Sequence, residues 1–130
     1  MIAGIGVDIV EIGRMARALA RHEAAFFRRV FTEGEQADCR SEKGRAAHYA
    51  VRFAAKEAVM KALGCGWGPI GWQDVEIRRS RSGRPVVTLH GDAARVAAQR
   101  GIAAVHVSLS HEREYAVAYA VAVHGLGDRS

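Results

Sequence analysis

Residues 45–63 constrain the fold most, because they predict one long helix without a clean polar face. The helix is expected to end at Gly64, since glycine commonly occupies the position just past a helix C-terminus. A surface helix normally has one wide polar face, but here charged and large apolar side chains are interspersed and alanine fills much of the rest. From residue 52 onward, the charged positions are Arg52, Lys56, Glu57 and Lys61. We expect these charges to face a partner or a ligand rather than bulk water.

Glu57 and Lys61 also permit a purely structural interpretation. They are four residues apart and therefore share one face of the helix. Such a pair stabilises an exposed helix by roughly 0.2–0.5 kcal/mol. Charged and large apolar residues are interspersed around the pair, which favours a functional role over the purely structural one.

The rest of the chain predicts short strands and helices around this helix. The expected helices are 12–30, a short one opened by the capping-box spacing of Thr32 and Glu35, and one from an Asp92 cap to Arg100, ending at Gly101. The expected strands are 3–10, 72–79, 85–90, 104–110 and 115–124, with loops at 41–44, 64–71 and 80–84 and a loose tail at 125–130. This order predicts a single α+β domain over 1–130, with a largely antiparallel sheet packed by the long central helix.

The composition of the chain limits where the protein can be located and what it can bind. A chain of 130 residues fits one domain, and no apolar run approaches the roughly 20 residues that span a bilayer. The N-terminus has no basic leader, and Cys39 and Cys65 form neither a CxxC pair nor a zinc signature. We therefore expect a cytoplasmic protein. The net charge of +5 predicts an anionic partner, such as nucleic acid, a phosphorylated ligand or an acidic protein.

Asp8 is unusual because it interrupts an apolar strand pattern. Ile5, Val7 and Ile9 alternate with Gly6, Asp8 and Val10 along the first strand. If the face that carries Asp8 is buried, its carboxylate needs a cation or hydrogen-bond donors. The alternative is that Asp8 caps the helix that follows, and the sequence leaves both interpretations open.

Ser110 and His111 fall where the strand 104–110 ends and turns. A histidine there can change its charge near physiological pH, which suits a base or a phosphate contact, although a lone histidine at a turn is more often structural.

Two other motifs are misleading. The GxGxxG pattern of Gly66, Gly68 and Gly71 follows a helix and precedes a strand, the reverse of a dinucleotide site. The serines near His111 lack a nucleophile elbow.

Taken together, three segments supply two carboxylates, two lysines, an arginine and a histidine. Paired carboxylates with open positions are how proteins usually hold Mg²⁺ beside a phosphate, and Lys and Arg then neutralise the phosphate oxygens. This set suits phosphoryl-type transfer, in which positioning and charge do most of the work.

The same residues resemble the holo-acyl-carrier-protein synthases, the small bacterial 4′-phosphopantetheinyl transferases. The opening GIGVDIVE at 4–11 is similar to that family's first strand, and RFAAKEA at 52–58, with Lys61 and Gly64, resembles its central helix. GRP at 83–85 resembles its hairpin, and VSLSH at 107–111 resembles its late strand. Order, spacing and length agree over nearly the whole chain, except for 23–45.

The resemblance implies a transferase that moves the phosphopantetheine arm of coenzyme A onto a serine of apo acyl carrier protein and releases 3′,5′-ADP. Asp8 and Glu57 would bind Mg²⁺, and Lys61 would contact the phosphates and stabilise the leaving group. The general base stays open between Glu57, His111 and a water on the metal, and Glu112 has no assigned role. The expected coenzyme-binding residues are Arg52, Lys56, Lys61, Gly64, Pro85, Ser110 and His111.

The resemblance also implies partners. An acidic acyl carrier protein would dock on Arg14, Arg17 and Arg21, and the chain would form homotrimers with sites between subunits. Two other functions compete with this one. A basic nucleic-acid-binding module is favoured by charge alone, but aromatic residues make up only 7% of the chain and no such motif occurs. A metal-dependent phosphohydrolase would use the same carboxylates and hydrolyse coenzyme A without a carrier protein.

Overall fold

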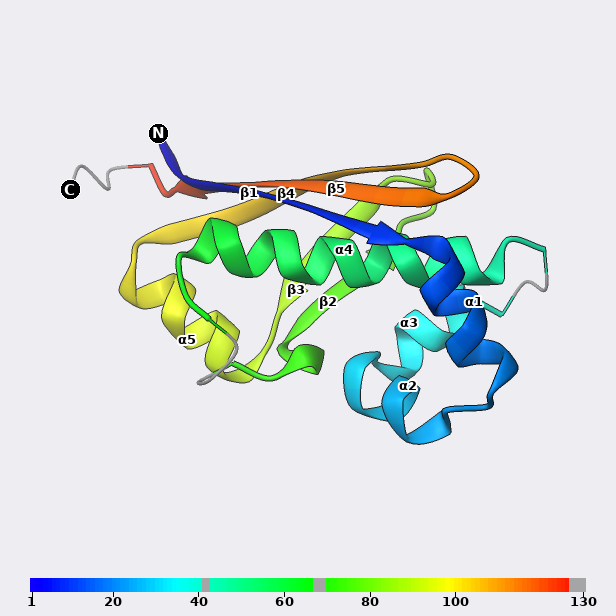
Figure 1. The fold of residues 1–130 in the computed structure, drawn as a ribbon. Helices are drawn as coiled ribbons and strands as arrows, with labels where there is room; N and C mark the ends of the chain where they lie inside the picture. Colours follow the sequence, from blue (N-terminus) through cyan, green and yellow to red (C-terminus); the bar gives the residue numbers. More distant parts are fainter. Residues whose placement is uncertain (41–42, 67–69, 127–130) are drawn as a thin grey trace.

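The computed structural model describes residues 1–40, 43–66 and 70–126 (Figure 1). Five helices, a short 3₁₀ helix (η1) and five strands follow one another in these residues. The elements are β1 Ile2–Glu11, α1 Ile12–Ala20, α2 Ala24–Val30, α3 Glu33–Asp38, α4 Arg45–Leu63, η1 Trp72–Asp74, β2 Val75–Arg79, β3 Pro85–Leu89, α5 Gly91–Gln99, β4 Ile102–His111 and β5 Tyr115–His124. The expected α+β class is confirmed.

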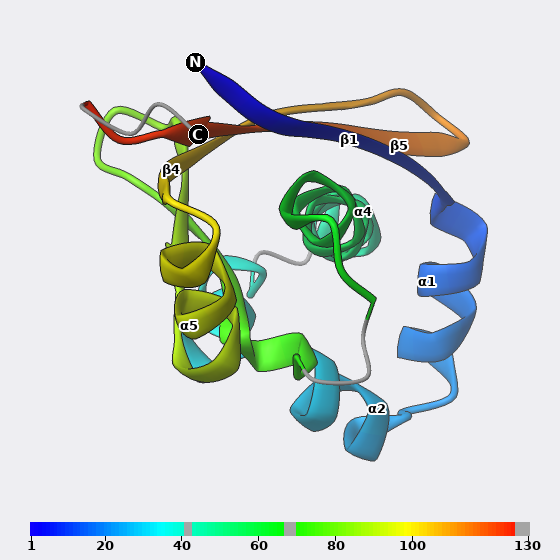
Figure 2. The same cartoon turned by 90° about the vertical axis from the view of Figure 1, so that its left-hand side faces the viewer.

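Helix α4 is the centre around which the other elements pack. Seen along its axis, it lies under one sheet, with α1 and α5 on opposite flanks and α2 below (Figure 2). Buried positions occur all round it, which explains the absence of a single polar face in its sequence. Gly64 ends the helix at φ 77°, a left-handed conformation that suits glycine, and its N–H bonds to the carbonyls of Met60 and Lys61.

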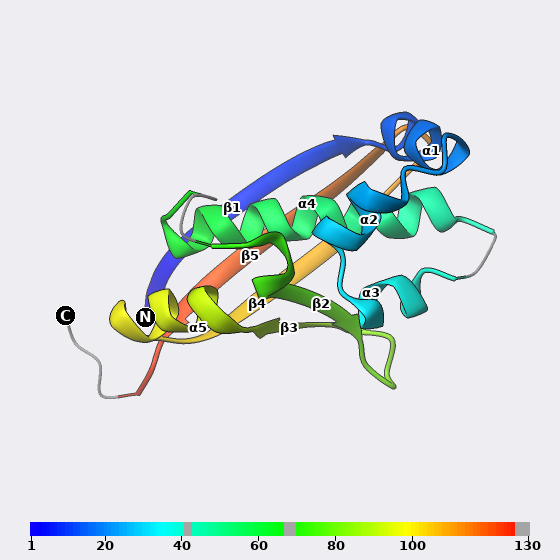
Figure 3. The same cartoon turned by 90° about the horizontal axis from the view of Figure 1, so that it is seen from below.

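Two antiparallel sheets carry the strands. The larger sheet has the order β1-β5-β4, so β1 and β4 form its two opposite edges, and β2 pairs with β3 in a separate hairpin. From below, this hairpin lies alongside α4 and between α5 and α3 (Figure 3). The prediction of largely antiparallel pairing is confirmed, although the strands divide between two sheets.

Small residues let α4 lie close against the larger sheet. A Cβ added at Gly4 or Gly6 on β1 would overlap the carbonyl oxygen of Ala62 or Ala58 on α4. The inner face of β5 is likewise built of alanines, at 116, 118, 120 and 122. This close approach brings the inner side chains of β1 within reach of α4, which is how Asp8 meets that helix.

The opposite face of this sheet is apolar and exposed. Ile5, Val7 and Ile9 on β1 are 70%, 43% and 61% exposed, and Tyr119 on β5 is 58% exposed. The register places Val7 beside Tyr119 and Ile5 beside Val121 on that face. A contiguous exposed apolar surface of this kind marks an interaction site rather than an ordinary solvated face.

The expected helix 12–30 is wrong in one respect, because the chain breaks at 21–23 into α1 and α2. His22 adopts a left-handed φ of 52° at the break. The turn lets Phe27 enter an aromatic cluster, where its ring lies 4.8 Å from that of Tyr49 and 5.8 Å from that of Phe31. No glycine or proline signals this turn, so periodicity alone continues the helix.

Two other boundaries also differ from the expectations. The predicted strand 72–79 begins with η1, and only Val75–Arg79 is extended. Helix α5 begins at Gly91 with His90 as its N-cap residue, so Asp92 lies in the first turn and is not the cap. The capping box of Thr32 and Glu35 is confirmed, with both of its reciprocal hydrogen bonds present.

Two expected loops and the expected tail are described only in part. Residues 41–42 of the loop 41–44, residues 67–69 of the glycine-rich loop and residues 127–130 of the expected tail lie outside the described residues. In the part of the chain that is described, no helix is both long enough and apolar enough to cross a bilayer.

Candidate active site

Most of the residues singled out from the sequence divide between two cavities, whereas Lys56, Lys61 and Gly64 line neither of them. The first measures about 710 Å³ and lies where β1 meets α1 and α4. We call it the carboxylate pocket, and its lining includes Asp8, Glu57, Arg14, Arg17 and Arg21. The second measures about 510 Å³ and lies between α4, the β2–β3 hairpin and the end of β4. We call it the arginine pocket, and its lining includes Arg52, Arg78, Arg79, Arg84, Pro85, Ser110, His111 and His48.

Asp8 and Lys61 form the junction between β1 and α4 beside the carboxylate pocket. The Lys61 ammonium lies 3.4 Å from Asp8 Oδ1 and donates a hydrogen bond of 2.9 Å to the Val7 carbonyl. The Asp8 side chain is 23% exposed, so it has the cation that a largely buried carboxylate requires. The helix-cap alternative is excluded, because Glu11 occupies the N-cap position of α1.

Glu57 lines the same cavity as Asp8, so two carboxylates open on one space. Among the described residues, no cluster of three or more His, Cys, Asp or Glu side chains could hold a metal ion by itself. Mg²⁺ in proteins usually takes one or two carboxylates and completes its shell with waters and substrate phosphates. The donor set therefore fits a magnesium ion whose remaining ligands come from a phosphorylated substrate.

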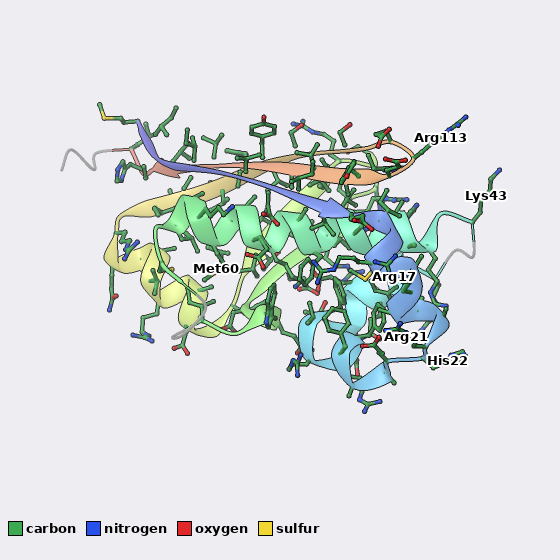
Figure 4. All side chains as sticks on the ribbon, viewed as in Figure 1. Arg17, Arg21, His22, Lys43, Met60 and Arg113 are labelled. Atoms are coloured by element: carbon green, nitrogen blue, oxygen red, sulfur yellow. The ribbon has the colours of Figure 1, made fainter. Side chains whose placement is uncertain are left out.

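Two arginines of α1 and the arginine that follows it line the same cavity as these carboxylates. Arg14, Arg17 and Arg21 all line the carboxylate pocket, and Arg17 lies 3.5 Å from Glu11. Arg17 and Arg21 lie, with Lys43 and Arg113, at the end of the molecule where α4 begins (Figure 4). The lining of the carboxylate pocket itself combines three arginines with the four carboxylates of Asp8, Glu11, Glu23 and Glu57.

Arg52 is the most buried cation of the arginine pocket. It is 4% exposed, one of its terminal nitrogens donates to the His48 carbonyl at 3.1 Å, and the other lies 3.8 Å from Asp38. Within the described residues its Nε has no hydrogen-bond partner. Because buried donors are nearly always satisfied, an unsatisfied Nε beside a cavity suits an anionic ligand.

His48 lies among these cations. Burial lowers the pKa of its imidazole, and the charges of Arg79, Arg52 and His111 lower it further. One terminal nitrogen of Arg79 lies 3.4 Å from His48 Nδ1. The arginine pocket therefore favours a neutral His48, while its guanidinium groups remain charged.

Pro85, Ser110 and His111 reach the arginine pocket from two different strands. Pro85 opens β3, and Ser110 and His111 end β4. His111 and Glu57, the two residues proposed as base candidates, therefore line different cavities of the same chain. Glu112, next to His111, caps the β4–β5 turn by accepting the backbone N–H groups of Glu114 and Tyr115.

Lys56, which the family resemblance assigns to coenzyme binding, lies in the protein interior. Its side chain is fully buried, 2.8 Å from Glu35, and its ammonium donates to the carbonyls of Trp72 and Val75 at 3.0 and 2.6 Å. Burial lowers its pKa, and the Glu35 carboxylate opposes that shift. A direct coenzyme contact would require Lys56 to give up one of these protein partners, and that contact remains a prediction.

Gly64 also has a structural position. It closes α4, and the neighbouring Leu63 carbonyl accepts a hydrogen bond from Arg100. Among the described residues that line the two pockets, Gly64 does not appear. A contact between Gly64 and the coenzyme remains a prediction.

Several residues of the site were not found from the sequence. Glu35 and Asp38 on α3 contact the cations of α4 and β2, and Arg78, Arg79 and Arg84 supply much of the arginine pocket. The capping-box spacing identified Glu35 as a cap but gave no sign of its second role. The arginines could have been found from their position on both sides of the predicted hairpin turn.

Comparison with known proteins assigns the family. Residues 4–120 match the 4′-phosphopantetheinyl transferase superfamily. The chain belongs to this superfamily. A member from Desulforudis audaxviator, named holo-[acyl-carrier-protein] synthase, is 52% identical over 95% of this chain and 94% of that protein. One of the same name from Moorella thermoacetica is 49% identical over 89% and 90%.

Solved structures of superfamily members share the fold. Holo-[acyl-carrier-protein] synthase from Helicobacter pylori, in complex with coenzyme A, is 30% identical with a TM-score of 0.80, over 92% of this chain and 99% of that one. The synthase from Bacillus anthracis, in complex with CoA (3′,5′-ADP), is 34% identical with a TM-score of 0.78, over 96% and 99%. These superfamily members bind coenzyme A or its nucleotide fragment on the same fold.

Proposed function

We propose that this protein transfers the 4′-phosphopantetheine arm of coenzyme A to a serine of apo acyl carrier protein and releases 3′,5′-ADP. The observation that carries the proposal is the pair of pockets: one offers carboxylates for a metal and the other offers arginines for phosphates. Relatives at about half identity over nearly the whole chain are named as synthases of this reaction.

The arginine pocket is the proposed site of the nucleotide half of coenzyme A. Among the described residues, its lining contains four arginines, two histidines and no carboxylate. Bidentate guanidinium groups suit phosphate oxygens, and the nucleotide half carries a 3′-phosphate in addition to the pyrophosphate. The unsatisfied Nε of Arg52 and the hydroxyl of Ser110 are further donors for these oxygens.

The carboxylate pocket is the proposed site of the reacting pyrophosphate. Asp8 and Glu57 would hold Mg²⁺ there, which offsets the negative charge of the pyrophosphate when bound. Lys61 already lies beside Asp8, so it can stabilise the phosphate oxygens of the departing 3′,5′-ADP. In the transfer, the serine oxygen bonds to the phosphorus that bears the pantetheine arm, and the bond from that phosphorus to the nucleotide breaks.

The serine proton must pass to a base as that bond forms. Glu57 and His111 are the two side chains proposed for this role, because a carboxylate and a neutral imidazole can each accept a proton. Since they line different pockets of one chain, only one of them can be adjacent to the serine unless the two pockets come together.

We propose that the two pockets come together between subunits of a homotrimer. They flank opposite edges of the β1-β5-β4 sheet, the carboxylate pocket at β1 and the arginine pocket at β4. A head-to-tail ring brings one edge of each copy to the other edge of its neighbour. The exposed apolar face of Ile5, Val7, Ile9 and Tyr119 is the surface that such a ring would bury.

The assembly can be tested with Val7→Glu, which places a charge in the apolar face. Val86→Glu is the matched control, because Val86 is 46% exposed and lies on β3, outside that face. We expect a trimer for the native protein and the control, and a monomer for Val7→Glu, by sedimentation equilibrium. A native protein that sediments as a monomer at micromolar concentration would contradict the proposal.

The acidic carrier protein is proposed to dock on Arg14, Arg17 and Arg21 beside the carboxylate pocket. A net charge of +5 would steer an acidic partner and raise its association rate, an effect that salt screens. A cytoplasmic location is proposed as well. It is supported by two cysteines without a disulfide, of which Cys39 is buried with its pKa raised to about 11.

The direct test is intact-mass analysis of apo acyl carrier protein incubated with this protein, coenzyme A and Mg²⁺. We expect the carrier protein to gain one phosphopantetheine unit, and to gain none with EDTA or when its acceptor serine is alanine. Consumption of coenzyme A without a carrier protein would instead favour the phosphohydrolase. A carrier protein of unchanged mass, with native and folded enzyme, would overturn the proposal.

A further inference from the structure

Helix α3 holds one edge of β2 with two carboxylates. Strand β2 pairs with β3 along one edge. On its other edge, the Ile77 N–H donates to Glu35 Oε2 at 2.7 Å and the Arg79 N–H donates to Asp38 Oδ2 at 3.1 Å. Glu35 and Asp38 are three residues apart and therefore share one face of α3. Ile77 and Arg79 are two residues apart, so their N–H groups point to the same edge of β2. Each carboxylate can therefore accept from one of the two N–H groups.

Asp38 also forms ion pairs with two arginines of this region. Its Oδ2 accepts from Arg78 Nε at 2.9 Å, its Oδ1 accepts from a terminal nitrogen of Arg78 at 3.3 Å, and a terminal nitrogen of Arg52 lies 3.8 Å away. Burial raises the pKa of Asp38, but the hydrogen bonds from Arg78 and the Arg79 N–H outweigh it. The pKa therefore lies below its ordinary value and the carboxylate is charged at neutral pH.

Arg79 connects Asp38 to the arginine pocket. Its backbone is held by Asp38, while its guanidinium lies 3.4 Å from His48 and lines the pocket. Side chains alternate along a strand, so fixing the Arg79 N–H at this edge also fixes the direction of its side chain. Arg52, the deepest cation of the pocket, is held from the same carboxylate.

We propose that Asp38 is a positioning residue for the phosphate-binding arginines: it sets the direction of Arg79 and holds Arg52 against the repulsion of its neighbours. This inference rests on the proposed function, because it takes the arginine pocket as the site of the nucleotide half of coenzyme A. Asp38 itself is not among the described residues that line that pocket, so it would act on the substrate through the arginines.

The direction in which the affinity for an anion changes when Asp38 is replaced distinguishes positioning from simple electrostatics. Removing a negative charge next to a cationic pocket raises its positive potential, so charge alone predicts tighter binding of an anion. Loss of positioning predicts weaker binding instead, because the cations no longer converge on one point. Asp38→Asn and Asp38→Ala remove the same charge, but only the asparagine keeps an acceptor for the Arg79 N–H.

The test is calorimetric titration of the full chain with 3′,5′-ADP, with Asp92→Asn as the control, since Asp92 is exposed and pairs only locally with Arg95. We expect Asp38→Ala to weaken binding roughly tenfold, Asp38→Asn to weaken it less, and the control to match the native protein. The number of sites per chain should stay unchanged in every variant, which a loss of folded protein would not allow.

Kinetics and a second variant complete the test. The KM for coenzyme A should rise in Asp38→Ala while kcat stays close to native, and Asp38→Ala should cost much less in an Arg79→Gln background. Binding that is equal or tighter in Asp38→Ala, or losses that simply add with Arg79→Gln, would overturn the positioning role. A native protein that does not bind 3′,5′-ADP would instead contradict the proposed function.

Discussion

Replacing Lys56 by methionine tests whether this lysine is structural. The Lys56–Glu35 pair is fully buried, and the ammonium also satisfies the carbonyls of Trp72 and Val75. Methionine fills much of the same volume but removes the charge and all three donor contacts. The change therefore leaves a buried carboxylate and two carbonyl groups without their partner.

The loss of unfolding free energy expected for Lys56→Met follows from these buried contacts. Removing one partner of a buried ion pair costs about 3–5 kcal/mol, which is a large share of the roughly 5–15 kcal/mol that stabilises a typical domain. For a domain of this size, that loss lowers the melting temperature by about 10–20 °C. Adding Glu35→Gln to Lys56→Met removes the unpaired charge, so the double variant should be more stable than Lys56→Met alone.

Urea unfolding followed by circular dichroism measures these free energies. Lys61→Met is the matched control, because it is the same substitution on the same helix at a lysine that is 55% exposed, where about 1 kcal/mol or less is expected. If Lys56→Met unfolded within 1 kcal/mol of the native protein while its KM for coenzyme A rose tenfold or more, the structural role would be wrong and a coenzyme contact would be right.

Three further changes have definite expected outcomes. Gly6→Ala should lower the melting temperature by more than 10 °C, because its Cβ would overlap the Ala58 carbonyl on α4. Gly66→Ala should lower it little, because no atom of the described residues lies within 4 Å of a Cβ added there. Burial raises the pKa of Glu76, but the hydrogen bonds that it accepts outweigh it and leave that pKa below its ordinary value. Its contribution to stability is therefore present above about pH 4.3, the unfolded pKa, and is lost as the pH falls through the lower folded pKa. The difference in unfolding free energy between Glu76→Gln and the native protein should therefore vanish in acid. A difference that does not change with pH would contradict this. Asp8→Ala should abolish Mg²⁺-dependent transfer with an unchanged circular dichroism spectrum, and native rates would refute its role as a metal ligand.

Much of the fold could be predicted because local chemistry and tertiary packing agree there. The mixed pattern of 45–63 indicated a helix enclosed by protein, and α4 is enclosed. The alternation around Asp8 correctly placed its carboxylate on the face opposite Ile5, Val7 and Ile9. It did not reveal that the apolar side faces outward, because alternation separates two faces without saying which one the domain buries.

The site was predicted less completely, because several of its contacts are long-range. Lys56 belongs to the same motif as Glu57, yet its position is set by Glu35, twenty-one residues earlier in the chain. Spacing along one helix carries no information about such a partner. Asp38 was missed for the same reason, since its role arises only where α3 meets the edge of β2.

The proposed ring assembles each transferase site from the carboxylate pocket of one copy and the arginine pocket of another. Mixing two defective variants tests it directly. Asp8→Ala damages only the first pocket and Arg84→Ala combined with His111→Ala damages only the second. Each should be inactive alone in the intact-mass assay.

Unfolding the two variants together and refolding them at equal amounts should restore transfer to the carrier protein. In randomly mixed rings, about a quarter of the sites combine two intact pockets, so about a quarter of the native rate is expected. A refolded mixture that stays as inactive as its parents, beside a native sample that recovers full transfer after the same treatment, would contradict the shared site.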